Sequence, residues 1–339
     1  MHIENAVKTQ ATPWFMDESR IQRKLASLET DIHPHAQSMI DNGYAIIRGG
    51  ISKERCEQLI ARFRLFADAN PDKFQKFLDK DGHYPRIVNL HVAMPELFEL
   101  FASNRLAYRV QQALWDATPC LYTSLFYERG SAQPPHRDTP LFATRPEYFY
   151  FGVWTALEDA TPANGALQVY SGGHRLPELD REAIAMRLFG SLDTIPAMSN
   201  DLWMDYQGKV DQQCKDAGLE LKSLYVNAGD TIIWHPQLPH GGGPIADMTK
   251  SRFSLVMHTT PIGAPVYHQD RFFNPRGDAP IDAPWQYEQA AGAYRVIHDR
   301  VDFDHKESFA VADFNIPPAE IKVGEAANKP ASLWRRLFG

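Results

Sequence analysis

Two histidines, an aspartate and an arginine follow one another in an order that could build an oxidative metal site. The chain contains His136-Arg137-Asp138, then His240 followed by three glycines, then Arg252-Phe253-Ser254. Two imidazoles and one carboxylate with open coordination positions form the facial triad of non-haem Fe(II) oxygenases. A planar, always-charged arginine suits the far carboxylate of a bidentate keto acid, and the Ser254 hydroxyl would assist it. These residues predict iron-dependent oxidation with a keto-acid cosubstrate.

The His-x-Asp pattern occurs twice, so its surroundings decide which copy binds a metal. His136-Arg137-Asp138 follows a β-rich stretch and the turn 131–135. Residues i and i+2 of a strand share a face, so His136 and Asp138 would both point inward while Arg137 points away. His268-Gln269-Asp270 comes after the strands, without a following glycine-rich turn or Arg-x-Ser strand. We therefore expect the first pair to supply the ligands.

The third ligand is either His235 or His240. His235 ends the apolar run 231–234, which favours a buried, hydrogen-bonded histidine near the site. His240 precedes three glycines, and glycine lets backbone approach a metal or a bound ligand closely because it has no Cβ. We predict His240 as the ligand, and we interpret His174 as a turn histidine bonded to backbone.

A rival class of protein would use the same three ligands. A zinc hydrolase, or a non-oxidative metal-binding jelly-roll protein, also fits two histidines and a carboxylate. Arg252-x-Ser254 separates these alternatives, because a hydrolase has no need of an anchor for a keto acid. The residues alone favour the oxygenase but do not exclude the zinc hydrolase or the non-oxidative metal-binding protein.

The elements that must position these residues change in character along the chain. Residues 1–120 read as mainly helical, with a strand over 44–47 and Ser52 as a helix N-cap. From residue 121 short strands with Gly, Pro and Asn between them indicate an antiparallel sandwich or barrel. We expect one domain over 1–339: helical support over 1–120, a jelly-roll core over 121–262, a C-terminal arm over 263–339. Asn164-Gly165 predicts a hairpin turn, and 179–221 reads as a partly helical insertion.

The composition of the chain indicates which kinds of binding partner to expect. The chain has 339 residues, a formal net charge of −7 and three cysteines, which do not form a disulfide framework. We expect a cytoplasmic protein that binds a small-molecule substrate, with no nucleic-acid partner, no secretion signal, no membrane association, and homodimerisation left open. Polar residues expected near the mouth of the site could receive an anionic molecule: Arg137, Arg145, Tyr148, Tyr150, His268 and Arg271. We interpret Trp334-Arg335-Arg336-Leu337-Phe338 as a frayed terminus.

Three segments together resemble the phytanoyl-CoA dioxygenase family of Fe(II)- and 2-oxoglutarate-dependent oxygenases. Residues 42–49 look like the family's N-terminal strand, 154–175 like its central segment, and 229–243 like the segment with the distal ligand. The resemblance covers roughly residues 35–262. One departure is Ser171-Gly172-Gly173-His174, which stands in place of the more usual Pro-Gly-Ser-His.

The resemblance implies a mainly β fold, with a double-stranded β-helix core, flanking N-terminal helices and a C-terminal arm. It implies that His136, Asp138 and His240 bind Fe(II) and that Arg252 and Ser254 anchor 2-oxoglutarate. Four further residues match positions that line the cosubstrate pocket in relatives: Tyr122, Ser124, Trp154 and Gly242. The implied reaction uses O2, hydroxylates an unactivated C–H bond of a small anionic metabolite, and releases succinate and CO2. Asp138 stands where halogenating relatives have a small residue, so we expect hydroxylation.

Overall fold

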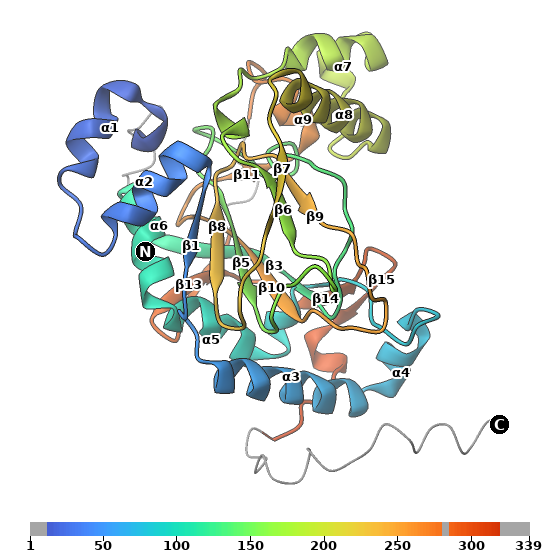
Figure 1. Cartoon of the computed structure of the whole chain (residues 1–339). Helices are drawn as coiled ribbons and strands as arrows, with labels where there is room; N and C mark the ends of the chain where they lie inside the picture. Colours follow the sequence, from blue (N-terminus) through green and yellow to red (C-terminus); the bar gives the residue numbers. More distant parts are fainter. Residues whose placement is uncertain (1–11, 280–284, 319–339) are drawn as a thin grey trace.

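Two facing β-sheets form the frame of the molecule in a computed structural model that describes residues 12–279 and 285–318 (Figure 1). The larger sheet has the order β1-β8-β5-β10-β3-β2-β14-β15, and β13 joins β3 and carries β12. Its strands are β1 Tyr44–Ile47, β2 Ile87–Val88, β3 Pro119–Tyr127, β5 Phe151–Ala156, β8 Thr231–Trp234, β10 Ser254–Pro261, β12 Tyr287–Ala290, β13 Ala293–Val296, β14 Arg300–Phe303 and β15 Glu307–Ala310. The smaller sheet, of order β7-β6-β9, consists of β6 Leu167–Tyr170, β7 Leu221–Leu224 and β9 His240–Gly242, and β4 Ala143–Thr144 pairs with β11 Val266–Tyr267.

Helices cover the outer face and the ends of this frame, and α3 lies along the lower end in Figure 1. Ser52 caps α3 by accepting a hydrogen bond from the Arg55 backbone N–H, as the sequence predicts. The α-helices are α1 Glu18–Leu25, α2 His33–Asn42, α3 Lys53–Asp68, α4 Pro71–Phe74, α5 Pro95–Ser103, α6 Arg105–Trp115, α7 Arg181–Phe189, α8 Asn200–Asp216 and α9 Gln269–Phe272. Short 3-10 turns are Trp14–Met16, Gln75–Phe77, Leu90–Val92, Gly173–Arg175, Leu192–Thr194 and Val311–Asp313.

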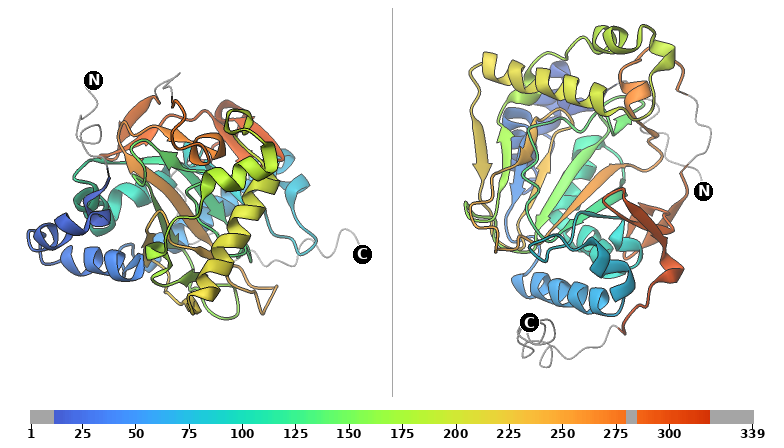
Figure 2. Two further views of the ribbon diagram at one scale, coloured as in Figure 1. Left: turned by 90° about the horizontal axis from the view of Figure 1, so that it is seen from above. Right: turned by 90° about the vertical axis from the view of Figure 1, so that its right-hand side faces the viewer.

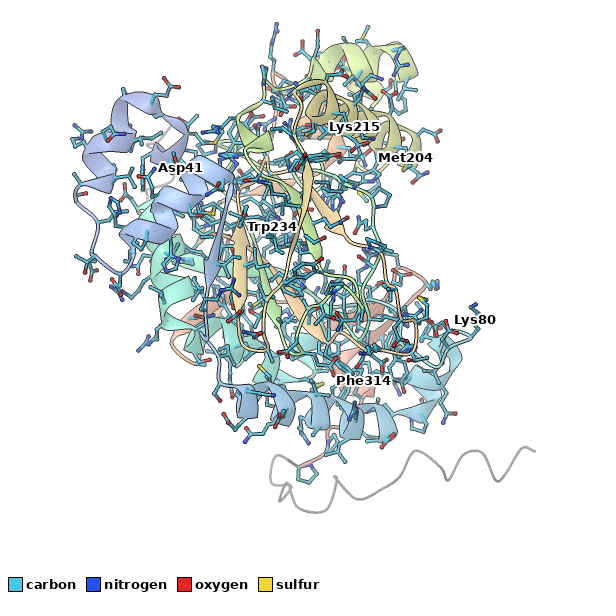
Figure 3. The ribbon with its side chains drawn as sticks, viewed as in Figure 1. Asp41, Lys80, Met204, Lys215, Trp234 and Phe314 are labelled. Atoms are coloured by element: carbon cyan, nitrogen blue, oxygen red, sulfur yellow. The ribbon has the colours of Figure 1, made fainter. Side chains whose placement is uncertain are left out.

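Both faces of the central strands are buried, which explains why their sequences do not alternate between apolar and polar residues. On the helical side, Trp115 of α6 stacks on Phe151 of β5, with ring centroids 4.3 Å apart. On the side that faces the smaller sheet, Trp154, Trp234 and Val256 belong to a second apolar cluster. Figure 3 shows Trp234 in the middle of the molecule, among the strands. The space between the two sheets is where a buried site can form.

The prediction of a β-hairpin at Asn164-Gly165 is wrong. The strand before it, β5, lies in the larger sheet, and the strand after it, β6, lies in the smaller one. The turn itself forms, because the Asn164 amide donates to the backbone oxygens of Asp159 and Ser251. It therefore carries the chain from one sheet to the other instead of pairing neighbouring strands.

The described part of the predicted C-terminal arm extends the larger sheet. The strand β13 pairs in parallel with β3, and β14 pairs antiparallel with β2. These strands are short and half-exposed, so their sequences carry little of the periodicity that marks a buried strand. The segment 334–338, interpreted above as a frayed terminus, lies outside the described residues.

The segment predicted as an insertion contains α7 and α8, which lie between β6 and β7 in the chain. These helices cover one end of the two-sheet frame (Figure 2). Met204 projects from the outer side of α8 (Figure 3), whereas Leu202 and Tyr206 of the same helix are buried. Across the residues that the structure describes, no helix has the length and apolar character needed to cross a membrane.

Candidate metal centre

His136, Asp138 and His240 converge between the sheets, and one ligand atom from each lies within 4.8 Å of the others. The distances from Asp138 are 3.5 Å from Oδ1 to Nε2 of His136 and 3.6 Å from Oδ2 to Nε2 of His240. The backbones of the two histidines also exchange hydrogen bonds of 2.8 and 3.0 Å, which tie the loop segment with His136 to β9. All three residues are buried. In the described ranges, no other group of His, Cys, Asp or Glu has this geometry.

Each histidine is held in the tautomer that a metal requires. Nδ1 of His136 lies 2.9 Å from the carbonyl oxygen of Pro134, and Nδ1 of His240 lies 2.9 Å from that of Leu238. A carbonyl oxygen only accepts, so both Nδ1 atoms are protonated and both Nε2 atoms present lone pairs toward Asp138. Burial lowers the pKa of His240 to about 4, which keeps this ring neutral at pH 7. The donor set fits Fe(II), and it also fits Zn²⁺.

Asp138 is oriented by two hydrogen bonds to one of its oxygens. The hydroxyl of Tyr150 donates to Oδ2 at 2.7 Å, and Nε1 of Trp234 donates to the same atom at 3.0 Å. Burial alone would raise the pKa of Asp138, but the positive charge that His240 and His136 carry in acid, where this carboxyl titrates, outweighs burial and holds this pKa well below its ordinary value. The carboxylate is therefore ionised, and Oδ1 is free of these donors.

His258 extends this network behind Asp138. The distance from its Nδ1 to the Tyr150 oxygen is 2.5 Å, and Tyr150 has already given its one proton to Asp138. Nδ1 of His258 is therefore the donor, and Nε2 has no hydrogen-bond partner among the described groups. Sequence reasoning missed this role for both residues. A signal existed, because His258 and Val256 are two residues apart on one strand face, and Arg252, just before the strand, continues the same spacing.

We predict that Tyr150→Phe weakens metal binding while leaving the fold intact. The substitution removes the hydroxyl that orients Asp138 and retains a ring that stacks on Phe142 at 4.9 Å. Loss of a hydrogen bond that orients a metal ligand raises the metal dissociation constant about 10-fold to 100-fold. Anaerobic Co(II) titration measures this, with Tyr148→Phe as the control, because Tyr148 does not line the cavity. An unchanged dissociation constant for Tyr150→Phe would contradict the assigned role.

A cavity of about 360 Å³ opens on the three residues, and Arg252 lines it. The Arg252 side chain is buried and lies over the ring of Trp154, 5.3 Å from its centroid. One of its nitrogens donates to the backbone oxygen of Gly165, Nε has no partner, and no carboxylate of the described residues pairs with it. Burial lowers the pKa of Arg252 to about 10, so it remains charged at neutral pH. A buried, unpaired guanidinium in a cavity wall can bind an anion.

Of the six residues predicted to bind the cosubstrate, Arg252, Tyr122, Trp154 and Gly242 line this cavity and two do not. A β-bulge explains why Ser124 does not line the cavity. The register between β3 and β10 shifts between His258 and Thr259, which leaves Tyr122 without an opposite residue. Beyond the bulge Thr123, Leu125 and Tyr127 face the cavity, and the Ser124 hydroxyl lies 2.7 Å from Nδ1 of His91 on the other side.

Ser254 is fully buried between two lining residues, Arg252 and Val256, but is not itself part of the wall. Its hydroxyl has no hydrogen-bond partner in the described part of the chain. The sequence predicts Arg252 and Ser254 on one strand, but that strand, β10, begins only at Ser254. The backbone N–H of Arg252 is instead bonded to the carbonyl of Glu128.

The glycines after His240 make room for a neighbouring segment of the protein. A Cβ on Gly241 would lie 2.5 Å from the carbonyl oxygen of Gln133, and one on Gly242 would lie 2.7 Å from the Ser131 hydroxyl. The loop that leads to His136 therefore packs directly on β9. Gly241 and Gly242 also line the cavity, so the prediction that they allow backbone to approach a bound ligand stays a prediction.

The remaining histidines agree with their structural interpretations. His235 is buried, accepts a hydrogen bond from the Gln237 backbone N–H and packs edge-on against Phe15. His174 lies in a 3-10 turn and is bonded to the carbonyl oxygen of Ile40. His268 bonds the carbonyl of Leu141, and Asp270 pairs with Arg271.

The predicted mouth residues are mostly misplaced. Of the six, only His268 lines the cavity. Arg137 does point away from the metal site, as expected, but it is fully buried and reaches Glu178 and the carbonyl of Gly173. Arg145 donates to the carbonyl of Arg271, and Tyr150 is fully buried behind Asp138. Residues that sequence reasoning did not place there form the wall instead, among them Arg86, Phe142, Trp203 and His298.

Comparison with known proteins gives consistent matches. A family model described as phytanoyl-CoA dioxygenase (PhyH) matches residues 39–252. A probable phytanoyl-CoA dioxygenase from Caenorhabditis elegans is 31% identical over 113 residues, 33% of this chain and 31% of the relative. The peroxisomal phytanoyl-CoA dioxygenase of Rattus norvegicus is 24% identical over 220 residues, 60% of this chain and 61% of the relative. The chain thus spans between about a third and three-fifths of these relatives.

Solved structures show the same fold at low identity. The non-heme alpha ketoglutarate dependent carbocyclase SnoK from nogalamycin biosynthesis has a TM-score of 0.54 at 15% identity, covering 80% of this chain and 98% of its own. EctD from S. alaskensis, solved with 2-oxoglutarate and 5-hydroxyectoine, has a TM-score of 0.51 at 15% identity, covering 87% and 93%. Together with the two facing sheets, these neighbours confirm the predicted jelly-roll fold class with flanking helices.

Proposed function

The chain belongs to the phytanoyl-CoA dioxygenase family, and on that premise we propose that it is an Fe(II)- and 2-oxoglutarate-dependent oxygenase. It hydroxylates an unactivated C–H bond of a small anionic metabolite and releases succinate and CO2. His136, Asp138 and His240 would hold the iron, and Arg252 would bind the far carboxylate of 2-oxoglutarate. One observation carries the proposal: Arg252 is buried, has no carboxylate partner within 12–279 and 285–318, and lines the same cavity as the triad.

The unpaired arginine favours an oxygenase over a zinc hydrolase. An isolated buried charge costs several kcal/mol unless a partner compensates it. A dicarboxylic keto acid supplies that partner, whereas a hydrolase that uses only metal-bound water has no reason to retain the cost. The planar guanidinium also matches a carboxylate in two-point geometry.

The protein supplies orientation and a dry cavity for this chemistry. Bound iron would activate O2 for attack on a C–H bond. Ionised Asp138 would neutralise part of the charge of a bound metal, and the tautomers of His136 and His240 are set by backbone carbonyls. Apolar side chains, including Leu125, Leu141, Phe142 and Val256, line the cavity and limit the entry of water.

The charges in the wall support an anionic substrate. Among the described residues Asp138 is the one carboxylate that lines the cavity, whereas Arg86 and several histidines also line it. The partner of Arg86, Asp304, is 3.1 Å away but lies outside this wall. An incoming anion therefore meets basic and neutral groups around the metal position.

We predict that anaerobic addition of Fe(II) and 2-oxoglutarate produces a weak visible charge-transfer band. The band requires the keto acid to chelate the metal, so Fe(II) alone and 2-oxoglutarate alone are the controls. A protein that binds Fe(II) tightly without the band would favour the non-oxidative alternative. A panel of small carboxylates, phosphonates and acyl thioesters, scored by succinate release against neutral and cationic analogues, then tests the substrate class.

We also propose that the chain works as a single oxygenase domain in the cytoplasm, as a monomer or a homodimer. Its three cysteines are buried and free, which agrees with a reducing compartment.

A further inference from the structure

A glutamine from the insertion holds the backbone between two of the proposed ligands. Oε1 of Gln207, on α8, accepts a hydrogen bond of 2.8 Å from the N–H of Arg137. Its Nε2 donates one of 2.9 Å to the carbonyl oxygen of the same residue. Gln207 is 6% exposed, so water does not compete for these bonds.

The two bonds complete a β-like segment that has a neighbour on one side only. His136 exchanges backbone hydrogen bonds with His240 on that side. Successive residues of an extended chain direct their N–H and C=O groups to opposite sides, so those of Arg137 point away from β9. No described strand pairs there. The side-chain amide of Gln207 has the same donor and acceptor as a peptide group, and it takes the place of the missing strand.

Two further contacts bind this part of α8 to the same segment. Trp203, one helical turn before Gln207, lines the cavity with its ring centroid 5.7 Å from that of His136. Tyr206 donates to Glu178, the carboxylate that also pairs with Arg137. The insertion is thus in contact with the ligand-bearing segment at its backbone, at a ligand ring and at the side chain between the ligands.

We propose that Gln207 is a positioning residue for the metal centre, which fixes the spacing of His136 and Asp138 through the backbone of Arg137. The inference rests on the proposed function, because it assumes that these residues bind a metal. It gives α8 a part in metal binding.

The test compares Gln207→Met with the wild-type protein, using anaerobic Co(II) as the probe. Methionine keeps the length of the side chain but can neither donate to Arg137 nor accept well from it. We expect the Co(II) dissociation constant to rise about 10-fold, the lower end of what loss of an outer-shell partner costs. The visible Co(II) spectrum at saturation should also change, because the ligand geometry is less constrained. Gln212→Ala is the matched control, since Gln212 lies on α8, is exposed and bonds Asp216.

Measurements are made at temperatures where circular dichroism shows each variant fully folded. A lower melting temperature for Gln207→Met with unchanged Co(II) affinity and spectrum would show a merely structural role and overturn the inference. An equal loss in Gln212→Ala would do the same. Gln207→Glu, which keeps the volume and the acceptor for the Arg137 N–H, provides the comparison if the methionine variant does not fold, and it too should bind Co(II) more weakly. Failure of the wild-type protein to bind Co(II) would instead contradict the proposed function itself.

Discussion

Asp138→Ala is expected to abolish metal binding and turnover in a protein that still folds. The substitution removes one of the three proposed ligands, the carboxylate whose two oxygens lie near Nε2 of His136 and of His240. Loss of a direct ligand should exceed the roughly 100-fold upper cost of losing an outer-shell partner. Succinate release should fall to background, and anaerobic Fe(II) or Co(II) titration should show no saturable binding at micromolar protein.

The chain contains its own control for this experiment. Asp270 belongs to the second His-x-Asp pattern and pairs with Arg271, outside the cavity wall. Asp270→Ala should leave metal binding and turnover close to the wild-type values. Full activity of Asp138→Ala, or an equal loss in Asp270→Ala, would remove the proposed ligand set. A melting curve checks the fold, since Tyr150 and Trp234 lose their acceptor in the Asp138 variant.

Arg252→Ala is expected to raise the KM for 2-oxoglutarate strongly with little change in metal affinity. Hydrogen bonds to a charged group contribute about 1.5–3 kcal/mol, which corresponds to about a 10-fold to 150-fold change in binding. The rate at saturating 2-oxoglutarate should change much less, because the proposed contact is with the end of the cosubstrate away from the reacting carbon. Steady-state kinetics with 2-oxoglutarate varied at fixed Fe(II) separates the two effects.

Two further variants sharpen this expectation. Arg252→Lys keeps the charge but loses the planar two-point contact, so its KM should lie between those of the wild type and the alanine variant. Arg145→Ala is the control, because Arg145 is a partly buried arginine that donates to the Arg271 carbonyl and does not line the cavity. A KM for Arg252→Ala equal to that of Arg145→Ala would move the cosubstrate anchor elsewhere.

The candidate ligands could be predicted from the sequence because their geometry is local. The spacing of His136 and Asp138 places both on one face of an extended segment, and the glycines after His240 mark a close approach of backbone, whatever their cause. The strand Tyr44–Ile47 and the cap at Ser52 follow from neighbouring residues in the same way. Such features need no knowledge of distant partners.

Other features depend on contacts between segments far apart, and these could not be predicted. The bulge opposite Thr259 reverses the face of Ser124, and no pattern within β3 announces it. Tyr150 reads as a surface aromatic until β5 is placed beside β8 and β10. Gln207 lies in the segment 179–221, outside the three segments on which the family resemblance rests. Its role appears only when α8 is packed beside Arg137.

Residues from early and late parts of the chain line the same cavity, so the cavity cannot be complete until most of the chain has been synthesised. Arg86 and Asn89 come early in the chain, whereas His298 and His305 come more than two hundred residues later and line the same cavity. A ribosome that has released residues up to Arg252 has delivered every proposed ligand but not the strands β13 and β14, which close against β3 and β2. Pairings of such long sequence separation form slowly. The proposed ligands are therefore synthesised before β13 and β14, and the wall of the cavity is completed only when those strands have been made.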